Sequence, residues 1–323
     1  MAQSARLWYT GVIILHGRRE TMMRILNFGS LNLDFTYTVP HFVRPGETLA
    51  AEKLEVFAGG KGLNQSTALC RAGAEVFHAG CVGPDGGGLL EQLRQDGADL
   101  RFVRTLPGVR TGHTIIQVDG AGQNCILVCG GANRRADAAM AQEVLDAFGP
   151  GDWLLLQNEI SGLDSILRLA GEKGLHIAFN PSPISPEIRR LPLETVELFL
   201  VNEVEGAALG GSGSPEECLE GLRRRFPGAR LVLTLGTDGA FYFDGTRTLF
   251  QPAFSVQAVD STAAGDTFTG YFLAALGEGL DGGDALRLAA AAAAISVTRM
   301  GASPSIPTRA ETEAFLQSRQ KEI

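Results

Sequence analysis

The chain has 323 residues, 45% of them hydrophobic and 20% charged, a composition typical of one large or two smaller folded domains rather than of a disordered chain. Acidic residues (36) outnumber basic ones (28), and the net charge of −8 argues against DNA or RNA as a partner, which would need clustered positive charge. The longest uncharged apolar runs, such as Leu288–Thr298, are eleven residues long, whereas a membrane span needs about 20. Five cysteines, an odd number, do not indicate a disulfide framework. We therefore expect a soluble, cytoplasmic protein without a membrane partner.

The first residues differ from the rest of the chain. A short apolar patch, Leu7–Leu15, is followed by Arg18 and Arg19, and the segment has neither the length of a membrane anchor nor a signal-peptide cleavage site. Residues 1–22 are therefore expected to be a disordered extension or the product of an upstream start. A single domain is expected over residues 23–323.

Strand-like and helix-like segments alternate along that domain. Strands are expected within Met22–Gly29 and at Val76–Val82, Trp153–Leu156, His176–Phe179, Leu198–Val201 and Leu231–Leu235. Helices are expected at Leu63–Arg71, Gly88–Gln95, Ala138–Phe148, Leu163–Glu172, Pro215–Phe226, Thr267–Leu276 and Asp284–Val297. This alternation predicts an α/β fold, a doubly wound, mostly parallel sheet with helices on both faces.

Two segments interrupt the alternation with a polar–apolar repeat of two residues, which is typical of antiparallel strands. One joins Leu33–Val39 to Thr48–Phe57, and the other joins Thr114–Val118 to Asn124–Cys129 across a glycine-containing turn. These strands, from about residues 33–57 and 113–129, predict a small β-sheet that covers a cleft of the α/β body as a lid.

Asp266 follows a run of small residues and falls in the first turn of a predicted helix. The free N–H groups of a helix start bind anions without any net positive charge. A carboxylate beside such a site can orient and deprotonate a hydroxyl group in phosphoryl transfer. The alternative reading of Asp266 is a first-turn acid that only complements the helix dipole.

Two further segments carry polar groups suited to a small ligand. Asn32 and Asp34, directly after the first strand, can present an amide and a carboxylate to neighbouring hydroxyl groups, or they can form an Asx turn. The glycine-rich Gly59–Gln65 opens a helix and exposes Lys61 and Asn64 to a ligand, or it is a solvated turn.

From Arg24 to about Pro307 the chain resembles the ribokinases of the PfkB-type carbohydrate kinase family. Each motif that carries the resemblance is weak alone, but their order and spacing together are specific. The motifs are Gly29-Ser30-Leu31-Asn32-Leu33-Asp34, Pro45-Gly46-Glu47-Thr48, Gly59-Gly60-Lys61-Gly62-Leu63-Asn64-Gln65, Asn180-Pro181-Ser182-Pro183, Asn202-Glu203-Val204-Glu205 and Asp260 to Asp266.

The resemblance implies ATP-dependent phosphorylation of the primary hydroxyl of D-ribose to ribose 5-phosphate. The same motifs also serve kinases of fructose, deoxyribose or a nucleoside, and a non-catalytic sugar sensor is a third reading. By resemblance, Asp266 is the catalytic base, and the backbone amides around Ala264 and Gly265 stabilise the transferred phosphoryl group. The sugar contacts implied are Asn32, Asp34, Gly60, Lys61, Asn64, Glu159 and Asp266.

The resemblance also implies nucleotide, Mg²⁺ and K⁺ sites and a homodimer that forms through the lid. The nucleotide contacts are Asn202, Thr234, Gly236, Thr237, Gly239, Ala263 and Gly265, and Glu205 acts on Mg²⁺ through water. The K⁺ loop is matched by Asp260, Thr262, Ser296, Arg299, Gly301 and Ser305. The chain departs from the family at Ala290, where many ribokinases carry a histidine near the adenine, and at Met300, where lysine is common.

Overall fold

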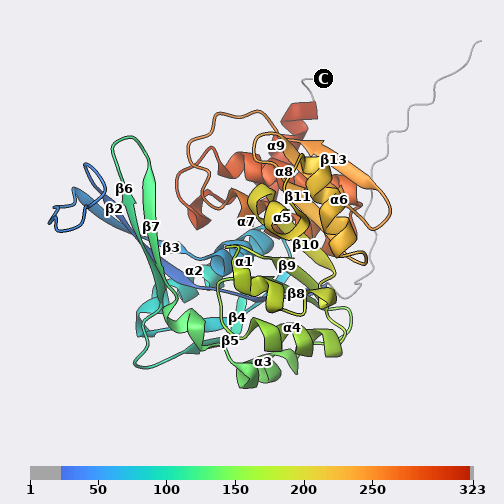
Figure 1. Cartoon of the computed structure of the whole chain (residues 1–323), viewed down its shortest axis with the longest axis horizontal. Coiled ribbons are helices and arrows are strands. Elements are labelled where there is room, and N and C mark those ends of the chain that lie inside the picture. The colour runs from blue at the N-terminus through green and yellow to red at the C-terminus, as the bar shows by residue number, and fades with distance from the viewer. Residues whose placement is uncertain (1–22, 321–323) are drawn as a thin grey trace, which may run out of the picture.

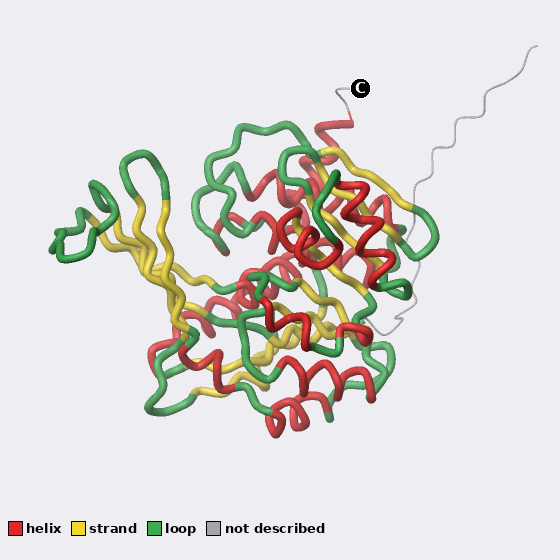
Figure 2. The backbone as a smooth tube through the Cα atoms, in the orientation of Figure 1, coloured by secondary structure: helices red, strands yellow, loops and turns green. Residues whose placement is uncertain are grey.

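The computed structural model describes residues 23–320, and its body is a nine-stranded sheet with helices on both faces (Figures 1 and 2). The extension expected over residues 1–22 lies outside the described residues. The strands follow the order β13-β12-β11-β10-β9-β8-β1-β4-β5. They are β1 (Arg24–Phe28), β4 (Glu75–Val82), β5 (Asp99–Thr105), β8 (Trp153–Gln157), β9 (His176–Asn180), β10 (Leu198–Asn202), β11 (Arg230–Thr234), β12 (Gly239–Phe243) and β13 (Thr248–Pro252).

All pairings from β5 to β11 are parallel, and β12 and β13 extend the sheet as antiparallel strands. The central strands are apolar on both faces because helices cover both: every residue of β8 is buried. The predicted α/β class and mostly parallel sheet are therefore confirmed.

Two hydrophobic cores separate the sheet from its helices. One lies against α1 (Lys61–Ala72), α2 (Gly87–Asp96), α7 (Ala264–Gly277) and α8 (Gly282–Ser296), with α9 (Arg309–Gln320) packed at its margin. The other lies against α3 (Ala138–Leu145), α4 (Leu163–Glu172), α5 (Glu203–Gly210) and α6 (Pro215–Arg225). Neighbouring residues of one strand serve opposite cores, as Ile25 and Leu26 do in β1. Short 3-10 helices lie at Pro84–Gly86, Gly131–Arg135, Pro186–Arg190, Leu193–Thr195 and Ser303–Ser305.

Three sequence-based boundaries are wrong by three or more residues. Helix α7 begins at Ala264 and not at Thr267. Helix α3 ends at Leu145 and not at Phe148, because the following residues form tighter turns, in which Ala147 N donates to Val144 O and Phe148 N to Leu145 O. The second lid strand begins at Lys53 and not at Thr48, because an irregular loop follows the turn at Gly46.

A separate four-stranded sheet, which we call the lid sheet, projects from one side of the body (left in Figure 1). Its order is β3-β2-β6-β7, with β2 (Asn32–Thr38), β3 (Lys53–Gly59), β6 (Gly112–Val118) and β7 (Asn124–Cys129). The two predicted antiparallel pairs are confirmed, and a parallel β2–β6 pairing joins them. No helix among residues 23–320 is long and apolar enough to span a membrane.

Candidate active site

The loop after β1 and the first turn of α1 are in close contact. A Cβ atom on Gly62 would lie 2.3 Å from the backbone nitrogen of Ser30, so only glycine allows this approach. The Ser30 hydroxyl accepts a hydrogen bond from Gly62 N at 3.1 Å and donates to Glu159 Oε2. Glu159 Oε2 also accepts from Lys61 N at 3.0 Å. Glu159, expected at the sugar, thus stabilises the start of α1, and burial raises its pKa.

Asp266 lies in the first turn of α7 with 6% of its surface exposed. Its Oδ2 accepts a hydrogen bond from Asn64 Nδ2 at 3.0 Å, and its Oδ1 accepts one from Gln65 Nε2 at 2.9 Å. The carboxylate therefore has a fixed orientation, since two side chains of α1 hold one oxygen each.

Lys61 places a positive charge close to Asp266. The Asp266 carboxylate is the largest cause of a raised pKa of Lys61; burial opposes it, and Glu159 and Glu205 add to it. The ammonium group therefore stays charged among three carboxylates.

The start of α7 has backbone amides without a side-chain cap. Among the described residues, Ala263 is the one residue other than glycine with a positive φ, at 60°. Such a conformation costs alanine about 1–2 kcal/mol, and strain of this kind concentrates at functional sites. Ala264 N donates to Ser261 O at 3.2 Å, and no side chain among the described residues caps the amides that follow, so the helix start is suited to an anion.

Two adjoining cavities meet at this helix start. The polar cavity, of about 220 Å³, is lined by Lys61, Asn180, Ser182, Leu200, Val201, Asn202, Glu205, Thr234, Ser261, Ala263, Ala264, Gly265, Asp266 and Thr269. The apolar cavity, of about 450 Å³, is lined by Gly236, Thr237, Gly239, Ala253, Phe254, Ser255, Val256, Ala258, Ser261, Ala264, Phe268, Ala290, Ala293, Ala294 and Val297. Ser261 and Ala264 line both. The pair can hold a ligand with one flat apolar part and one charged part.

Asn202 and Glu205 form a capping box at the start of α5. Glu205 Oε2 accepts from Asn202 N at 3.0 Å, and Asn202 Oδ1 accepts from Glu205 N at 2.9 Å. Glu205 is only 4% exposed and lines the polar cavity, so its carboxylate stays near any charged ligand there.

Asn32 and Asp34 begin the lid sheet. Asp34 Oδ1 accepts from the Thr114 hydroxyl at 2.6 Å; burial raises the pKa of Asp34, and this hydrogen bond opposes the rise. A Cβ atom on Gly59 would lie 1.8 Å from Asp34 Oδ2, so glycine leaves the space that the carboxylate fills. Asn32 Oδ1 accepts from Asn133 Nδ2 at 2.7 Å. Asn133, which sequence reasoning missed, thus orients the Asn32 amide.

The expected cation loop consists of two segments that contact each other. Asp260 Oδ2 accepts from Gly301 N at 2.9 Å, and Asp260 Oδ1 accepts from the backbone and hydroxyl of Thr262 at 2.9 and 2.6 Å. Ser296 and Ser305 are buried, and their hydroxyls donate to backbone carbonyls. The side-chain and backbone atoms that could ligate a cation here are oxygens, which suits a monovalent cation better than a transition metal.

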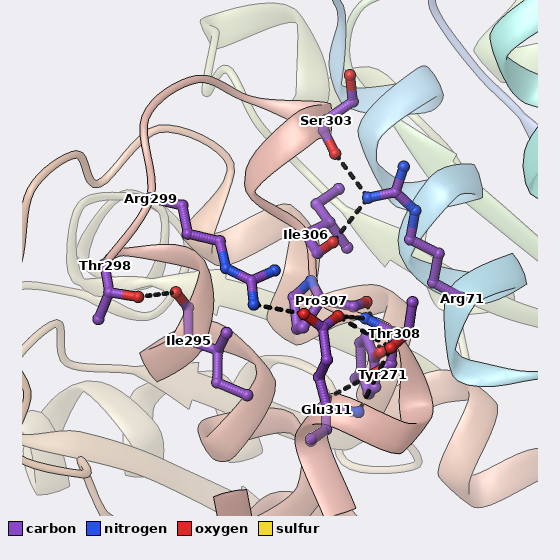
Figure 3. Close-up of polar contacts among 11 residues, drawn as sticks. Arg71, Tyr271, Ile295, Thr298, Arg299, Ser303, Ile306, Pro307, Thr308 and Glu311 are labelled. Atoms are coloured by element: carbon purple, nitrogen blue, oxygen red, sulfur yellow. Dashed lines mark hydrogen bonds and ion pairs between the residues drawn. The ribbon is translucent and has the colours of Figure 1, made fainter. Parts of the chain in front are cut away.

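Figure 3 shows how neighbouring helices hold the second segment of this loop. The Arg299 side chain pairs with Glu311 of α9 at 2.6 Å, so its guanidinium group is held by that helix. Arg71, near the end of α1, donates to the carbonyls of Ser303 at 3.0 Å and Ile306 at 2.6 Å. The Tyr271 hydroxyl of α7 donates to Pro307 O at 2.7 Å.

The described residues contain no group of three or more His, Cys, Asp and Glu side chains arranged to hold a metal ion. A divalent ion would thus depend on water and on ligand oxygens, which Mg²⁺ prefers.

The structure brings most of the predicted residues together. Lys61, Asn202, Glu205, Thr234, Ala263, Ala264, Gly265 and Asp266 share the polar cavity, and Gly236, Thr237 and Gly239 line the apolar one. Asn64 contacts Asp266 directly, whereas Asn32, Asp34, Gly60 and Glu159 line neither cavity. Ala290 lies in the apolar cavity, and Met300 is 71% exposed. Gln65 and Asn180 were not assigned a role from the sequence.

Known proteins resemble this chain in sequence and in fold. The family model described as "pfkB family carbohydrate kinase" matches residues 22–309. A ribokinase from Haemophilus influenzae is 35% identical over 300 residues, which cover 90% of this chain and 97% of the relative. A solved ribokinase from Cryptococcus neoformans in complex with ADP superposes with a TM-score of 0.81 at 32% identity, over 90% of this chain and 99% of the other. A solved Arabidopsis thaliana ribokinase, complexed with ribose and ATP, gives 0.79 at 28% identity, over 91% and 99%. By its sequence and its fold, the chain belongs to the pfkB family of carbohydrate kinases.

Proposed function

We propose that this kinase transfers the γ-phosphoryl group of ATP to the primary hydroxyl of D-ribose, giving ribose 5-phosphate and ADP. The observation that carries the proposal is Asp266, a buried carboxylate held by two amides beside the uncapped start of α7. The similarity to ribokinases over about 90% of the chain supports ribose as the acceptor.

Asp266 acts as the general base. It takes the proton of the primary hydroxyl as the hydroxyl oxygen attacks the γ-phosphorus, and the bond from that phosphorus to the β,γ-bridging oxygen breaks. The first-turn amides of α7 and the Lys61 ammonium stabilise the charge on the transferred group. The structural support is that Lys61, Gly265 and Asp266 line one cavity.

The sugar lies between the lid sheet and the start of α1. Asn32 and Asp34 bind its hydroxyls, with Gly60, Asn64 and Glu159 nearby. Two observations support this arrangement: Asn64 Oδ1 is buried without a hydrogen-bond partner among residues 23–320, and the Asp34 carboxylate is held in place by Thr114. A hydroxyl of the sugar would satisfy the orphan acceptor of Asn64.

The nucleotide occupies both cavities, with the adenine in the apolar one against Gly236, Thr237, Gly239 and Ala290. Its phosphates extend into the polar cavity toward Asn202, Thr234 and Ala263. Glu205 would hold Mg²⁺ through water, and bound Mg²⁺ neutralises phosphate charge. K⁺ would be held by oxygens of Asp260, Thr262, Ser296, Arg299, Gly301 and Ser305, and it would order the backbone that leads to α7.

A substrate panel tests this function. ADP release is measured with Mg-ATP and K⁺ on ribose, fructose, deoxyribose and adenosine, with Asp266→Asn as the control for contaminating kinases. Ribose-dependent ADP release with the highest kcat/KM is expected. A higher kcat/KM on another acceptor would show that this acceptor, and not ribose, is the preferred substrate. Binding of ribose without ADP release on any acceptor would indicate a sensor.

We also propose that two copies associate through the lid sheet in the cytoplasm. Exposed apolar side chains gather on that sheet, and Leu127 and Val128 of the edge strand β7 are 64% and 68% exposed. Such a surface usually marks an interface. Five free cysteines, with Cys125 and Cys129 exposed, support a reducing compartment. Sedimentation analysis should give a dimer that Leu127→Glu dissociates; a wild-type monomer would contradict the proposal.

A further inference from the structure

We propose that Gln65 is a positioning residue for the phosphoryl transfer, because a chain of buried amides behind it fixes its NH2 group against the Asp266 carboxylate. We call this chain the amide relay, and its members are Asn27, Gln157, Gln65 and Asn180. The proposal rests on the proposed function in that Asp266 is taken as the base. The orientation of the amides themselves follows from two backbone carbonyls.

The first of these carbonyls orients Asn27, which lies in β1 with no exposed surface. Its side-chain nitrogen is 2.8 Å from Gly62 O and 2.8 Å from Ser66 Oγ. A backbone carbonyl only accepts hydrogen bonds, so the atom that faces Gly62 must be the NH2 group. Asn27 Oδ1 therefore faces Gln157.

That orientation determines the next two amides. Asn27 Oδ1 requires a donor, so Gln157 presents its Nε2 at 2.9 Å. The same Nε2 is 2.7 Å from Gln65 Oε1 and supplies its second hydrogen there. With its oxygen directed at Gln157, Gln65 must direct its NH2 group the other way, where Asp266 Oδ1 lies at 2.9 Å.

The second carbonyl gives the same answer from the opposite side. Asn180 Nδ2 donates to Leu200 O at 2.8 Å, so Asn180 Oδ1 faces outward and accepts from Gln65 Nε2 at 3.1 Å. Both hydrogens of the Gln65 NH2 group are thus used, one on Asp266 and one on Asn180. Two independent anchors therefore exclude the flipped amide, which would set an oxygen against a carboxylate.

Burying these amides inside the sheet costs stability, which indicates that they serve a function other than folding. Gln157 and Asn27 lie within parallel strands whose other residues are largely apolar, and they are 1% and 0% exposed. Gln157 Oε1 has no hydrogen-bond partner among the described residues, a loss that an apolar side chain would avoid. Polar residues that break the local pattern of a sheet usually serve a site. Here they serve Asp266, whose other oxygen is held by Asn64.

Two substitutions test the role of Gln65. Gln65→Met keeps the length of the side chain and removes the donor, so kcat should fall about 10- to 100-fold, the usual worth of a hydrogen bond to a charged group. The Kd for ribose, measured by calorimetry, should stay within about threefold, because Gln65 donates to the base and not to the sugar. The matched control is Gln142→Met, since Gln142 donates to Asp146 at 2.7 Å on the exposed face of α3. A wild-type kcat in Gln65→Met would overturn the proposal.

Gln65→Glu tests the contact with Asp266 through the pH dependence of kcat, which would not change if Gln65 only stabilised the fold. The new carboxyl group and Asp266 would share one proton, so the acid limb of the kcat–pH profile should move to higher pH by at least one unit. Lys61 and Glu159 interact with Asp266, and Glu205 lines the same cavity; all three charged groups are the same in both proteins. Profiles of wild type and Gln65→Glu that overlay would count against the relay.

Neutron diffraction on the deuterated wild type decides the orientation without any activity. Two deuterons are expected on the Gln65 atom that faces Asp266, and deuterons on the atom that faces Gln157 would overturn the relay. This result holds even if a substituted protein does not fold. Absence of ADP release with every acceptor in the wild type would instead contradict the proposed function and leave the neutron result to judge the relay.

Discussion

His78 should make the protein less stable in mild acid. The residue lies in β4 with no exposed surface, and its Nδ1 is 2.8 Å from Ser66 Oγ, which also contacts Asn27. Burial is the largest cause of a pKa of His78 lowered from 6.5 to about 4. The unfolded chain therefore binds a proton on this residue below pH 6.5, and the folded chain does not until about pH 4. The contribution of the neutral His78 ring to the free energy of unfolding is therefore fully present above pH 6.5 and is lost as the pH drops toward 4.

The size of the effect follows from that difference in pKa. Between pH 6.5 and about 4, each pH unit lowers the free energy of unfolding by about 1.4 kcal/mol. A pH change from 7.5 to 5.0 should therefore lower it by about 2 kcal/mol, and a change across the whole range by about 3 kcal/mol. His78→Gln cannot titrate and keeps a polar side chain opposite Ser66. The free energy of unfolding of His78→Gln should thus gain about 2 kcal/mol relative to wild type over the same change in pH.

Urea unfolding of both proteins at pH 7.5, 6.5, 5.5 and 5.0 measures this difference, in which all other titrating groups cancel. A direct check is the NMR titration of the His78 ring, which should not charge above about pH 5 in the folded state. Free energies of unfolding that fall in parallel for wild type and His78→Gln would refute the reasoning, as would a ring that titrates near pH 6.5.

Four other outcomes are expected. Asp266→Asn should lower kcat about 10²- to 10⁴-fold with little change in ribose Kd, and a kcat near wild type would remove Asp266 from the mechanism. Asp34→Ala should weaken ribose binding about 10- to 100-fold by calorimetry and leave ATP binding unchanged; equal losses for both ligands would assign Asp34 to the fold. Ala263→Gly should relieve the positive φ and raise Tm by about 2–4 °C, and a lower Tm would show that no strain is stored there. KCl should raise kcat above NaCl or choline chloride at equal ionic strength, and identical rates would contradict a K⁺ site.

The sequence predicts well those elements that lie entirely in one environment. Continuous apolar runs such as Trp153–Leu156 are buried on both faces and read directly as parallel strands. Strand β5 was missed because it has only one neighbour and carries charged side chains along its length. Helix α5 was missed because it has only eight residues and its apolar residues do not gather on one face, and helix α9 because its apolar positions are few. Each nevertheless begins with a capping box, Asn202 with Glu205 and Thr308 with Glu311.

Some residues of the candidate site could likewise be predicted from the sequence, and others could not. Asp266 and Asn64 were identified because a helix start and a known motif surround them, whereas Gln65 and Asn133 carry amides with no chemical signature of their own. A signal for the relay was present: Asn27 and Gln157 are polar residues within strands that are otherwise largely apolar. Their partners could not be deduced, since they come from segments as far as 130 residues away.

Helix α1 has twelve residues and is bound at both ends. Its first turn contacts Ser30 and Glu159, and near its last turn Arg71 holds the carbonyls of Ser303 and Ile306. A rod fixed in this way cannot shift along its axis at one end without straining the other. If cation and acceptor bind where we propose, their binding should therefore be linked thermodynamically. A ligand that tightens one end of α1 then changes the affinity at the other end, and the factor is the same in both directions.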